Sequence, residues 1–98
     1  MTIWNFKNGQ REKAFLELDR ILNSLTRNSE GFRGYMSMLS TQEPNIATVL
    51  TLWQDEETLM KSEAEVFANA VKMVQDSLEN SPRVENYKIY STELFQRQ

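Results

Sequence analysis

The sequence predicts an α+β domain of the ferredoxin-like, split βαβ class, with a four-stranded antiparallel sheet and both helical units on one face. The first observation behind this prediction is the order of the elements: strand, helix, strand, strand, helix pair, strand. The second is a hairpin at 32–53 whose strands carry apolar residues on both faces. Because helices cover one face only, we expect a second copy of the chain to cover the other. Two such sheets packed face to face form a dimeric α+β barrel.

The first part of the chain is predicted to hold a short strand and an amphipathic helix. Aromatic and β-branched residues favour a strand from Ile3 to Lys7, and Asn8 is a candidate N-cap for the helix that follows. From Gln10 to Arg27 apolar residues recur at three- and four-residue steps, as in a helix with one buried face. The predicted buried stripe is Ala14, Phe15, Leu18, Ile21, Leu22 and Leu25, and the predicted solvent face is Arg11, Glu12, Glu17, Asp19 and Arg20.

The hairpin is predicted to follow directly. Gly31 suits the left-handed turn that ends the helix. We expect strands at Phe32 to Thr41 and Ile46 to Trp53, joined by a turn in which Pro44 and Asn45 take the central positions. This loop would pair Leu39 with Leu50 and Met36 with Trp53. It would place Gly34, Met36, Met38, Val49, Thr51 and Trp53 on one face, and Tyr35, Leu39, Leu50 and Leu52 on the other.

The remaining elements are a broken helix and a last strand. Asp55 is a candidate N-cap, with acidic residues in the first turn that follows it. Ser62 and Glu65 form a capping-box pattern, which predicts a short helix over 56–61, a bend near Ser62 and a second helix over 63–78. The second helix should bury Val66, Phe67, Ala70, Val71, Val74 and Leu78. Val84 to Glu93 is predicted to be a strand, and Leu94 and Phe95 make the tail at 92–98 apolar enough to dock.

Composition excludes several classes of function. The 98 residues suffice for one domain spanning 1–98, with one core. The chain has no Cys and no His, which removes thiolate chemistry, His-dependent nucleophile systems and His-ligated zinc or haem. A net charge of −3 disfavours nucleic-acid binding. No apolar run approaches the about 18 residues that span a bilayer, and no secretory signal is visible, so we expect a cytoplasmic protein that does not enter membranes.

The residues resemble the antibiotic biosynthesis monooxygenase-like domains of the dimeric α+β barrel superfamily. The resemblance rests on Phe6-Lys7-Asn8-Gly9-Gln10, Gly31-Phe32-Arg33-Gly34-Tyr35, Glu43-Pro44-Asn45, the segment from Leu52 to Leu59, and Val84-Glu85-Asn86-Tyr87. It covers nearly the whole chain and implies this fold and a homodimer. The family includes cofactor-independent monooxygenases of polycyclic phenols, quinol monooxygenases, haem-degrading enzymes and members of unknown activity.

The resemblance does not extend to the haem-degrading branch. That branch uses a His and a Trp on the second helical segment, and the spacing from Trp53 places them near Val71 and Ser62 of this chain. Neither residue is found at its position, and the chain has no His at all, so we expect no haem and no metal or other cofactor. Gly31 to Met36 also has a superficial similarity to an RNA-recognition motif, but it lies on the wrong strand and lacks a basic patch.

Candidate substrate-pocket residues are polar or aromatic side chains expected near the sheet: Trp4, Asn5, Arg33, Tyr35, Trp53 and Tyr87, with Tyr90 as a further polar candidate. Each has a structural alternative. Trp53 suits a packed strand end, Tyr35 and Tyr87 suit core or interface packing, and Arg33 suits a surface ion pair. No pair of carboxylates has a spacing that requires a metal or glycosidase role, and no catalytic residue can be named.

Two functions follow from this sequence. The first is cofactor-independent oxygenation of a small aromatic metabolite, phenolic or quinol-like, by a homodimer. Such chemistry needs a substrate that forms an electron-rich anion, together with hydrogen bonds and a dry cavity from the protein. The alternative is a non-catalytic dimer that binds a small hydrophobic ligand or acts as a stress-related accessory protein. An enclosed cavity with inward polar groups would favour the first, and a solid interior would favour the second.

Overall fold

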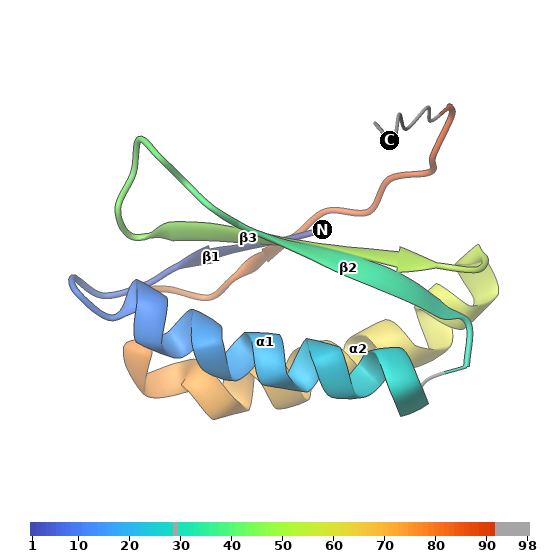
Figure 1. Ribbon diagram of the computed structural model, residues 1–98, viewed down its shortest axis with the longest axis horizontal. Helices are drawn as coiled ribbons and strands as arrows, with labels where there is room; N and C mark the ends of the chain where they lie inside the picture. The colour runs from blue at the N-terminus through green and yellow to red at the C-terminus, as the bar shows by residue number, and fades with distance from the viewer. Residues whose placement is uncertain (29, 92–98) are drawn as a thin grey trace, which may run out of the picture.

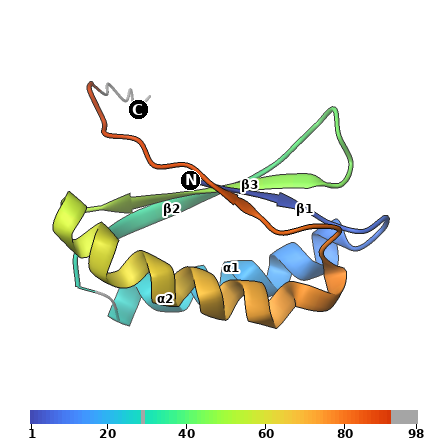
Figure 2. The ribbon, with the colours of Figure 1, turned by 180° about the vertical axis from the view of Figure 1, so that it is seen from behind.

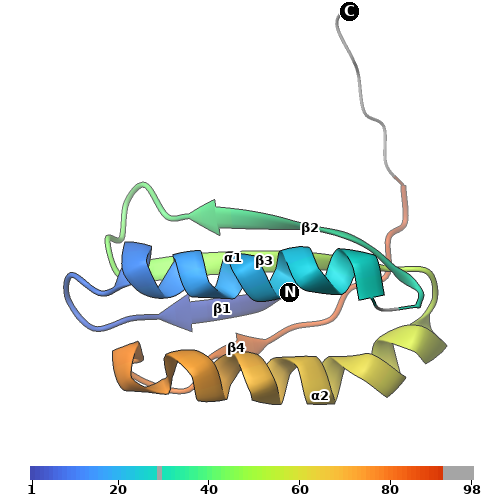
Figure 3. The same cartoon turned by 60° about the horizontal axis from the view of Figure 1, so that its bottom comes forward.

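Two helices pack against one face of a four-stranded antiparallel sheet in the computed structural model, which describes residues 1–28 and 30–91 (Figure 1). The elements are β1 (Thr2–Asn5), α1 (Arg11–Asn28), β2 (Phe32–Leu39), β3 (Ile46–Trp53), α2 (Glu56–Val74), η1 (Gln75–Ser77) and β4 (Arg83–Val84). The strand order is β2-β3-β1-β4 (Figure 3). Seen from behind, both helices still lie on the same side of the sheet (Figure 2). The predicted ferredoxin-like fold class is confirmed.

The core lies between the sheet and the helices. Its centre is aromatic: Trp4 stacks on Phe6 with ring centroids 6.3 Å apart, and Phe6 meets Phe15 of α1 edge-on at 6.4 Å. The predicted α1 stripe is buried at Ala14, Phe15, Leu18 and Leu22, while the side chain of Leu25 lies outside the described part of the chain. Ala47 and Val49 of β3 and Ala70 and Val74 of α2 complete the cluster.

The start of α1 differs from the prediction in two ways. The helix begins at Arg11, so Asn8 is too early to be its N-cap, and Asn8 instead accepts a hydrogen bond from Asn45 Nδ2 at 2.7 Å. Arg11 is not a solvent-face residue. Its guanidinium is largely buried and donates to the carbonyl oxygens of Ser40, Glu43 and Ile46 at 2.8, 3.2 and 3.2 Å. Arg11 thereby fixes the hairpin loop to the end of the helix.

That loop makes the predicted hairpin register wrong. The turn spans residues 40–45, so Leu39 pairs with Ala47 and Met36 pairs with Leu50. β2 consequently ends at Leu39 rather than Thr41. The pairing differs from the prediction by three residues, and an odd shift exchanges the faces of one strand relative to the other. Val49, Thr51 and Trp53 therefore share the helix-facing side with Tyr35, and Met36 and Met38 share the open side with Leu50 and Leu52.

α2 is one continuous helix, and the predicted bend at Ser62 is wrong. Asp55 caps it as predicted, because its Oδ1 accepts the Thr58 N–H at 2.8 Å and Thr58 Oγ1 accepts the Asp55 N–H at 3.4 Å. These hydrogen bonds, foremost that from the Thr58 backbone, lower the pKa of Asp55. Since this reciprocal cap already starts the helix, the later Ser62 pattern lies within the helix and interrupts nothing.

The last strand is much shorter than predicted. β4 pairs with β1 only at Val84 and Arg83, and Met1 and Glu85 then exchange two backbone hydrogen bonds of 2.8 Å. Beyond Glu85 no described strand lies alongside to pair with the chain. Residues 86–91 leave the sheet on the side away from the helices (Figures 1 and 2), with Tyr87, Ile89 and Tyr90 exposed. The predicted docking of Leu94 and Phe95 lies outside the described residues.

The sheet face opposite the helices is apolar and uncovered in one chain. It carries Ile3 and Asn5 of β1, Met36 and Met38 of β2, and Ile46, Thr48, Leu50 and Leu52 of β3. We call this set the open face. Met36, on the edge strand β2, is 57% exposed, and Leu52 on the neighbouring β3 is 37% exposed. No helix in the described part of the chain is long and apolar enough to cross a membrane.

Candidate functional site

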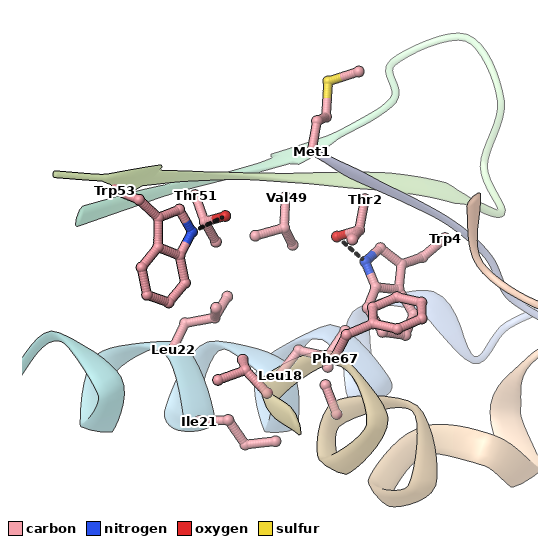
Figure 4. Close-up of a pocket in the computed structure, with 12 residues that line it drawn as sticks. Met1, Thr2, Trp4, Leu18, Ile21, Leu22, Val49, Thr51, Trp53 and Phe67 are labelled. Carbon is pink, nitrogen blue, oxygen red and sulfur yellow. Dashed lines mark hydrogen bonds between the residues drawn. The ribbon is translucent and has the colours of Figure 1, made fainter. Parts of the chain in front are cut away.

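A small cavity lies between the sheet and the two helices (Figure 4). The sheet contributes its floor through Thr2 and Trp4 of β1 and Val49, Thr51 and Trp53 of β3. The helices contribute the opposite wall: Leu18, Ile21 and Leu22 from α1, and Val66, Phe67 and Ala70 from α2. Met1 lies at its edge. The cavity volume is about 50 Å³, which is room for one or two water molecules.

The two Trp residues of the chain stand at opposite ends of this cavity and are held in the same way. Trp4 Nε1 donates to Thr2 Oγ1 at 2.8 Å, and Trp53 Nε1 donates to Thr51 Oγ1 at 3.1 Å. In both cases the acceptor is two residues earlier on the same strand, so it lies on the same face. Phe32 supports Trp53 from its other side with an edge-on contact at 5.0 Å. Each indole is therefore fixed by one hydrogen bond and by aromatic packing, from Phe6 and Phe67 for Trp4 and from Phe32 for Trp53.

The lining has no charged side chain. Thr2 and Thr51 carry its only side-chain hydroxyls, and the Met1 ammonium at the edge is engaged by the carbonyl oxygen of Glu85. No group of three acidic, His or Cys side chains that could hold a metal occurs among residues 1–28 and 30–91. The lining therefore matches a neutral apolar molecule in polarity and presents two hydroxyl groups, but none of its side chains is a carboxylate, an imidazole or an amine that could act as a base.

Phe67 separates the cavity from a second, wider hollow. Its ring packs against Trp4 with centroids 5.9 Å apart. It also lines an open groove of about 540 Å³ on the other side of α2, together with Ala68, Val71, Lys72, Gln75, Leu78, Asn80 and Ser81. Phe67 is the one residue that contributes to both hollows. Movement of its ring would join them, and a small molecule could then enter from solvent.

The structure places the six pocket candidates in different surroundings. Trp4 and Trp53 line the cavity. Asn5 lies on the open face and Arg33 is exposed beside a β-bulge, with its Nη2 3.4 Å from Gln54 Oε1. Tyr87 is 68% exposed and donates to Glu85 Oε2 at 2.8 Å, and Tyr90 is fully exposed. Tyr35 faces α1 outside the cavity.

Tyr35 is instead an electrostatic link between β2 and α1. Burial raises the pKa of the Tyr35 phenol, and its hydrogen bond to Asp19 and the charge of that carboxylate raise it further. Because the folded pKa is above the unfolded value of about 10, this contribution to stability is complete below pH 10 and is lost as pH rises through the folded pKa.

We therefore expect alkaline pH to weaken the wild type more than a Tyr35→Phe variant. The variant has no phenol to ionise at this site, so its free energy of unfolding should fall less steeply above pH 10. Urea unfolding of both proteins from pH 8 to pH 11 measures the difference. Parallel curves for the two proteins would show that Tyr35 does not couple folding to its ionisation.

The sequence-based candidates did not include Thr2, Thr51 and Phe67, the lining residues that carry the two hydroxyls and the contact with the groove. The two Thr residues carry a signal in the sequence, because Thr-Ile-Trp at 2–4 and Thr-Leu-Trp at 51–53 repeat one pattern. Each pattern lies in a strand, where i and i+2 share a face. Phe67 has no comparable signal, since its apolar spacing on a helix fits any core position.

Comparison with known families accounts for this architecture. A model of the antibiotic biosynthesis monooxygenase family matches residues 1–66, from β1 through the first half of α2. The chain belongs to the antibiotic biosynthesis monooxygenase family. The match includes the sheet side of the cavity, both Thr-x-Trp patterns and the α1 wall. The resemblance inferred from the hairpin and its flanking segments is confirmed.

Solved structures agree on the fold of this family member. A Bordetella bronchiseptica protein provisionally named as an antibiotic biosynthesis monooxygenase superposes with a TM-score of 0.72 at 16% identity, covering 90% of this chain and 92% of that one. A Nitrosomonas europaea protein of unknown function superposes with a TM-score of 0.75 at 16% identity, covering 95% of this chain and 88% of that one. A Bacteroides thetaiotaomicron protein of unknown function superposes with a TM-score of 0.65 at 22% identity, covering 84% of this chain and 87% of that one. No curated protein matches the sequence.

Proposed function

We propose that this family member is a homodimeric, single-domain protein that binds a small, neutral aromatic molecule in the helix–sheet cavity. The observation that carries the proposal is the cavity lining: two fixed indoles face an apolar helix wall, and no side chain of the lining is charged. Apolar and aromatic walls with a few placed polar groups are typical of small-molecule sites. The lining disfavours carboxylates and phosphates, because it has no cationic side chain and the Met1 ammonium at its edge is already engaged by the Glu85 carbonyl oxygen.

Binding requires the cavity to widen. A cavity of about 150 Å³ holds benzene, so the present volume of about 50 Å³ is too small for an aromatic ring. Phe67 is the lining side chain whose movement would connect the cavity to the open groove, because it contributes to both hollows. We therefore assign Phe67 as the entry point.

Replacing Phe67 with alanine should open the cavity permanently. We expect indole or benzene, used as probes, to bind at least tenfold more tightly to Phe67→Ala than to the wild type. The variant should also lose about 2–3 kcal/mol of stability, below the value for a fully buried Phe because Phe67 is only half-buried. Isothermal titration calorimetry and urea unfolding measure the two effects.

Met73→Ala is the matched control, since Met73 lies on the same helix, is 58% exposed and lines neither hollow. It should change neither probe affinity nor stability appreciably. Unaltered probe affinity in Phe67→Ala would remove Phe67 from the entry route.

Oxygenation of the bound molecule, a phenol or a quinol, is the second candidate function, and membership of the family favours it. In such a reaction the substrate loses a proton, its anion reduces O₂, and the resulting hydroperoxide loses water to leave a carbonyl. The cavity would contribute desolvation and two hydroxyl donors to the anion. Since no side chain of the lining is a base, we expect only substrates acidic enough to ionise into solvent water to react.

Oxygen uptake over a panel of quinols and anthrones tests this activity, with binding of the same compounds measured anaerobically. Uptake above the buffer rate that Trp53→Ala reduces would support oxygenation in this cavity. Binding without uptake would leave the non-catalytic ligand-binding function. We propose the cytoplasm as the location, since the chain has no Cys that an oxidising compartment could pair.

The homodimer is proposed from the open face. Met36, Met38 and Leu52 of this face are exposed, and Tyr87, Ile89 and Tyr90 are exposed on the segment that projects on the same side of the sheet. A second copy packed face to face would cover these residues and produce the dimeric α+β barrel.

A further inference from the structure

We infer that Thr2 and Thr51 are a pair of specificity-determining hydrogen-bond donors, which select a ligand with two acceptor oxygens on opposite sides of a ring. This inference rests on the proposed ligand-binding function of the cavity. It concerns the oxygen chemistry of the ligand, which an apolar cavity alone does not determine. A quinone or another cyclic diketone has this chemistry, whereas an unsubstituted hydrocarbon does not.

The direction of each hydrogen bond follows from the indole partner. A Trp Nε1–H donates and never accepts, so the Thr oxygen must be the acceptor in both pairs. Each hydroxyl proton remains available for another bond. Neither Thr2 nor Thr51 donates a side-chain hydrogen bond within residues 1–28 and 30–91. Both hydroxyls therefore favour a partner that accepts.

The strand register separates the two Thr residues by a distance that a six-membered ring can span. Thr2 is directly opposite Val49, and Thr51 lies two residues further along the same face of β3. Such a diagonal pair has Cα atoms roughly 7–8 Å apart. Figure 4 shows Val49 between the two Thr residues, with the helix side chains facing it. A six-membered ring lying under Val49 would direct its para oxygens toward the two hydroxyls.

The indoles make this selection more rigid than two free Thr residues would. A Thr hydroxyl rotates about one bond, and an indole N–H that donates to its oxygen disfavours rotamers that point the hydroxyl proton back at the ring nitrogen. Trp4 is itself held by Phe6 and Phe67, and Trp53 by Phe32. The donors are thus partly oriented before a ligand arrives, which reduces the entropy lost on binding.

A matched pair of probes tests the inference: 1,4-naphthoquinone and naphthalene, which share a ring skeleton and differ in the two oxygens. The chain has no Cys, so the quinone forms no thiol adduct. It has two Trp residues, and both line the cavity. Titrations followed by the two indole N–H signals in ¹H–¹⁵N NMR therefore report on each end of the cavity separately.

Thr2→Val and Thr51→Val should each weaken naphthoquinone binding by about 2- to 10-fold, the value of one neutral hydrogen bond. Naphthalene has no oxygen that could accept a hydrogen bond, so its affinity for the same variants should stay within about twofold of the wild-type value. Thr2→Ser and Thr51→Ser retain the hydroxyl and should restore the quinone affinity, and an unchanged naphthalene affinity in the Val variants separates the lost donor from loss of the indole's acceptor. Thr48→Val, on the same strand but the opposite face, is the control and should leave both probes unchanged.

Two results would overturn the inference, and they are distinguishable. If both probes bind equally well and the Val variants weaken neither or both alike, the Thr pair does not select oxygens, although the ligand-binding function stands. If neither probe shifts either indole signal, even in Phe67→Ala, the cavity binds no aromatic ligand and the proposed function fails together with the inference.

Discussion

Replacing Gly31 with alanine should destabilise the domain by about 3 kcal/mol or more. Gly31 has φ of +81°, a conformation that costs a residue with a Cβ roughly 1–2 kcal/mol. A Cβ built on Gly31 also lies 2.6 Å from Cγ2, 2.8 Å from Cβ and 2.9 Å from Oγ1 of Thr58. Non-bonded atoms do not approach a Cβ this closely, so either the start of β2 or the start of α2 must move.

Thr58 cannot move without further cost. Its hydroxyl donates to the Asp55 carbonyl at 3.0 Å, and its backbone N–H donates to Asp55 Oδ1 at 2.8 Å. Displacing Thr58 therefore breaks the N-cap of α2, and loss of a cap typically costs about 1 kcal/mol. Gly31 also accepts the Gln54 N–H at 2.6 Å, which joins the two ends of the hairpin. The strain would thus reach β2, β3 and α2 together.

Gly9→Ala is a matched control for this prediction. Gly9 has a similar φ of +77°, but a Cβ added to it would have no atom within 4 Å. It should lose only the conformational cost, about 1–2 kcal/mol. Equilibrium urea unfolding of both variants measures the difference. Equal losses at the two sites would show that Thr58 relaxes freely and that the contact with Gly31 does not constrain the fold.

The fold class was predictable because its main signals are local. The α1 stripe of Phe15, Leu18 and Leu22 depends only on helical period, and Asp55 depends only on capping chemistry. Gly31 was also expected in a left-handed conformation from its position after a helix. Element order then limits the topology to a few arrangements, of which the ferredoxin-like one is observed.

The hairpin register was not predictable from local signals. Pro44 and Asn45 favour a tight turn, but Arg11 donates to three carbonyl oxygens around residues 40–46 and stabilises a longer loop. This interaction joins residues about 30 positions apart in the sequence, so turn chemistry alone gives no sign of it. The short β4 has a similar cause: it is antiparallel to β1 and runs toward the start of that strand, so its pairing stops where β1 begins, whatever its own β propensity.

The candidate site was predicted only in part, because the roles of some of its residues depend on the strand register. Large aromatics such as Trp4 and Trp53 attract attention in a sequence, whereas a Thr hydroxyl acquires a role only when register places it beside an indole. The tyrosines show the opposite error, in which a predicted pocket residue lies outside the pocket. Tyr87 was a pocket candidate because a long β4 would have carried it along the sheet, and the observed β4 ends before it.

A single charge at the centre of the open face should convert the proposed dimer into a monomer. Leu50 lies in the middle of this face, opposite Met36 on β2 and beside the Thr48 that pairs with Ile3. In a symmetric dimer Leu50→Lys would place two ammonium groups near the twofold axis. Each would lose its hydration without gaining a partner, a penalty of several kcal/mol. A weakening of about 3–5 kcal/mol corresponds to roughly 10²- to 10³-fold or more in the dissociation constant.

Sedimentation equilibrium at micromolar concentration measures the change directly. The wild type should sediment as two chains and Leu50→Lys as one. The melting temperature of the wild type should rise with protein concentration, because association stabilises the folded state by mass action, and that of the variant should not. Its circular dichroism should remain native, since the substitution faces away from the helices and the core.

Leu16→Lys separates this effect from a general loss of apolar surface. Leu16 is 57% exposed on α1, on the helical side of the sheet, and it receives the same substitution. If the open face is the interface, Leu16→Lys remains dimeric while Leu50→Lys does not. If the helices formed the interface instead, the two results would be exchanged. A wild-type monomer at these concentrations would exclude the barrel altogether, and the apolar open face would then need a different partner.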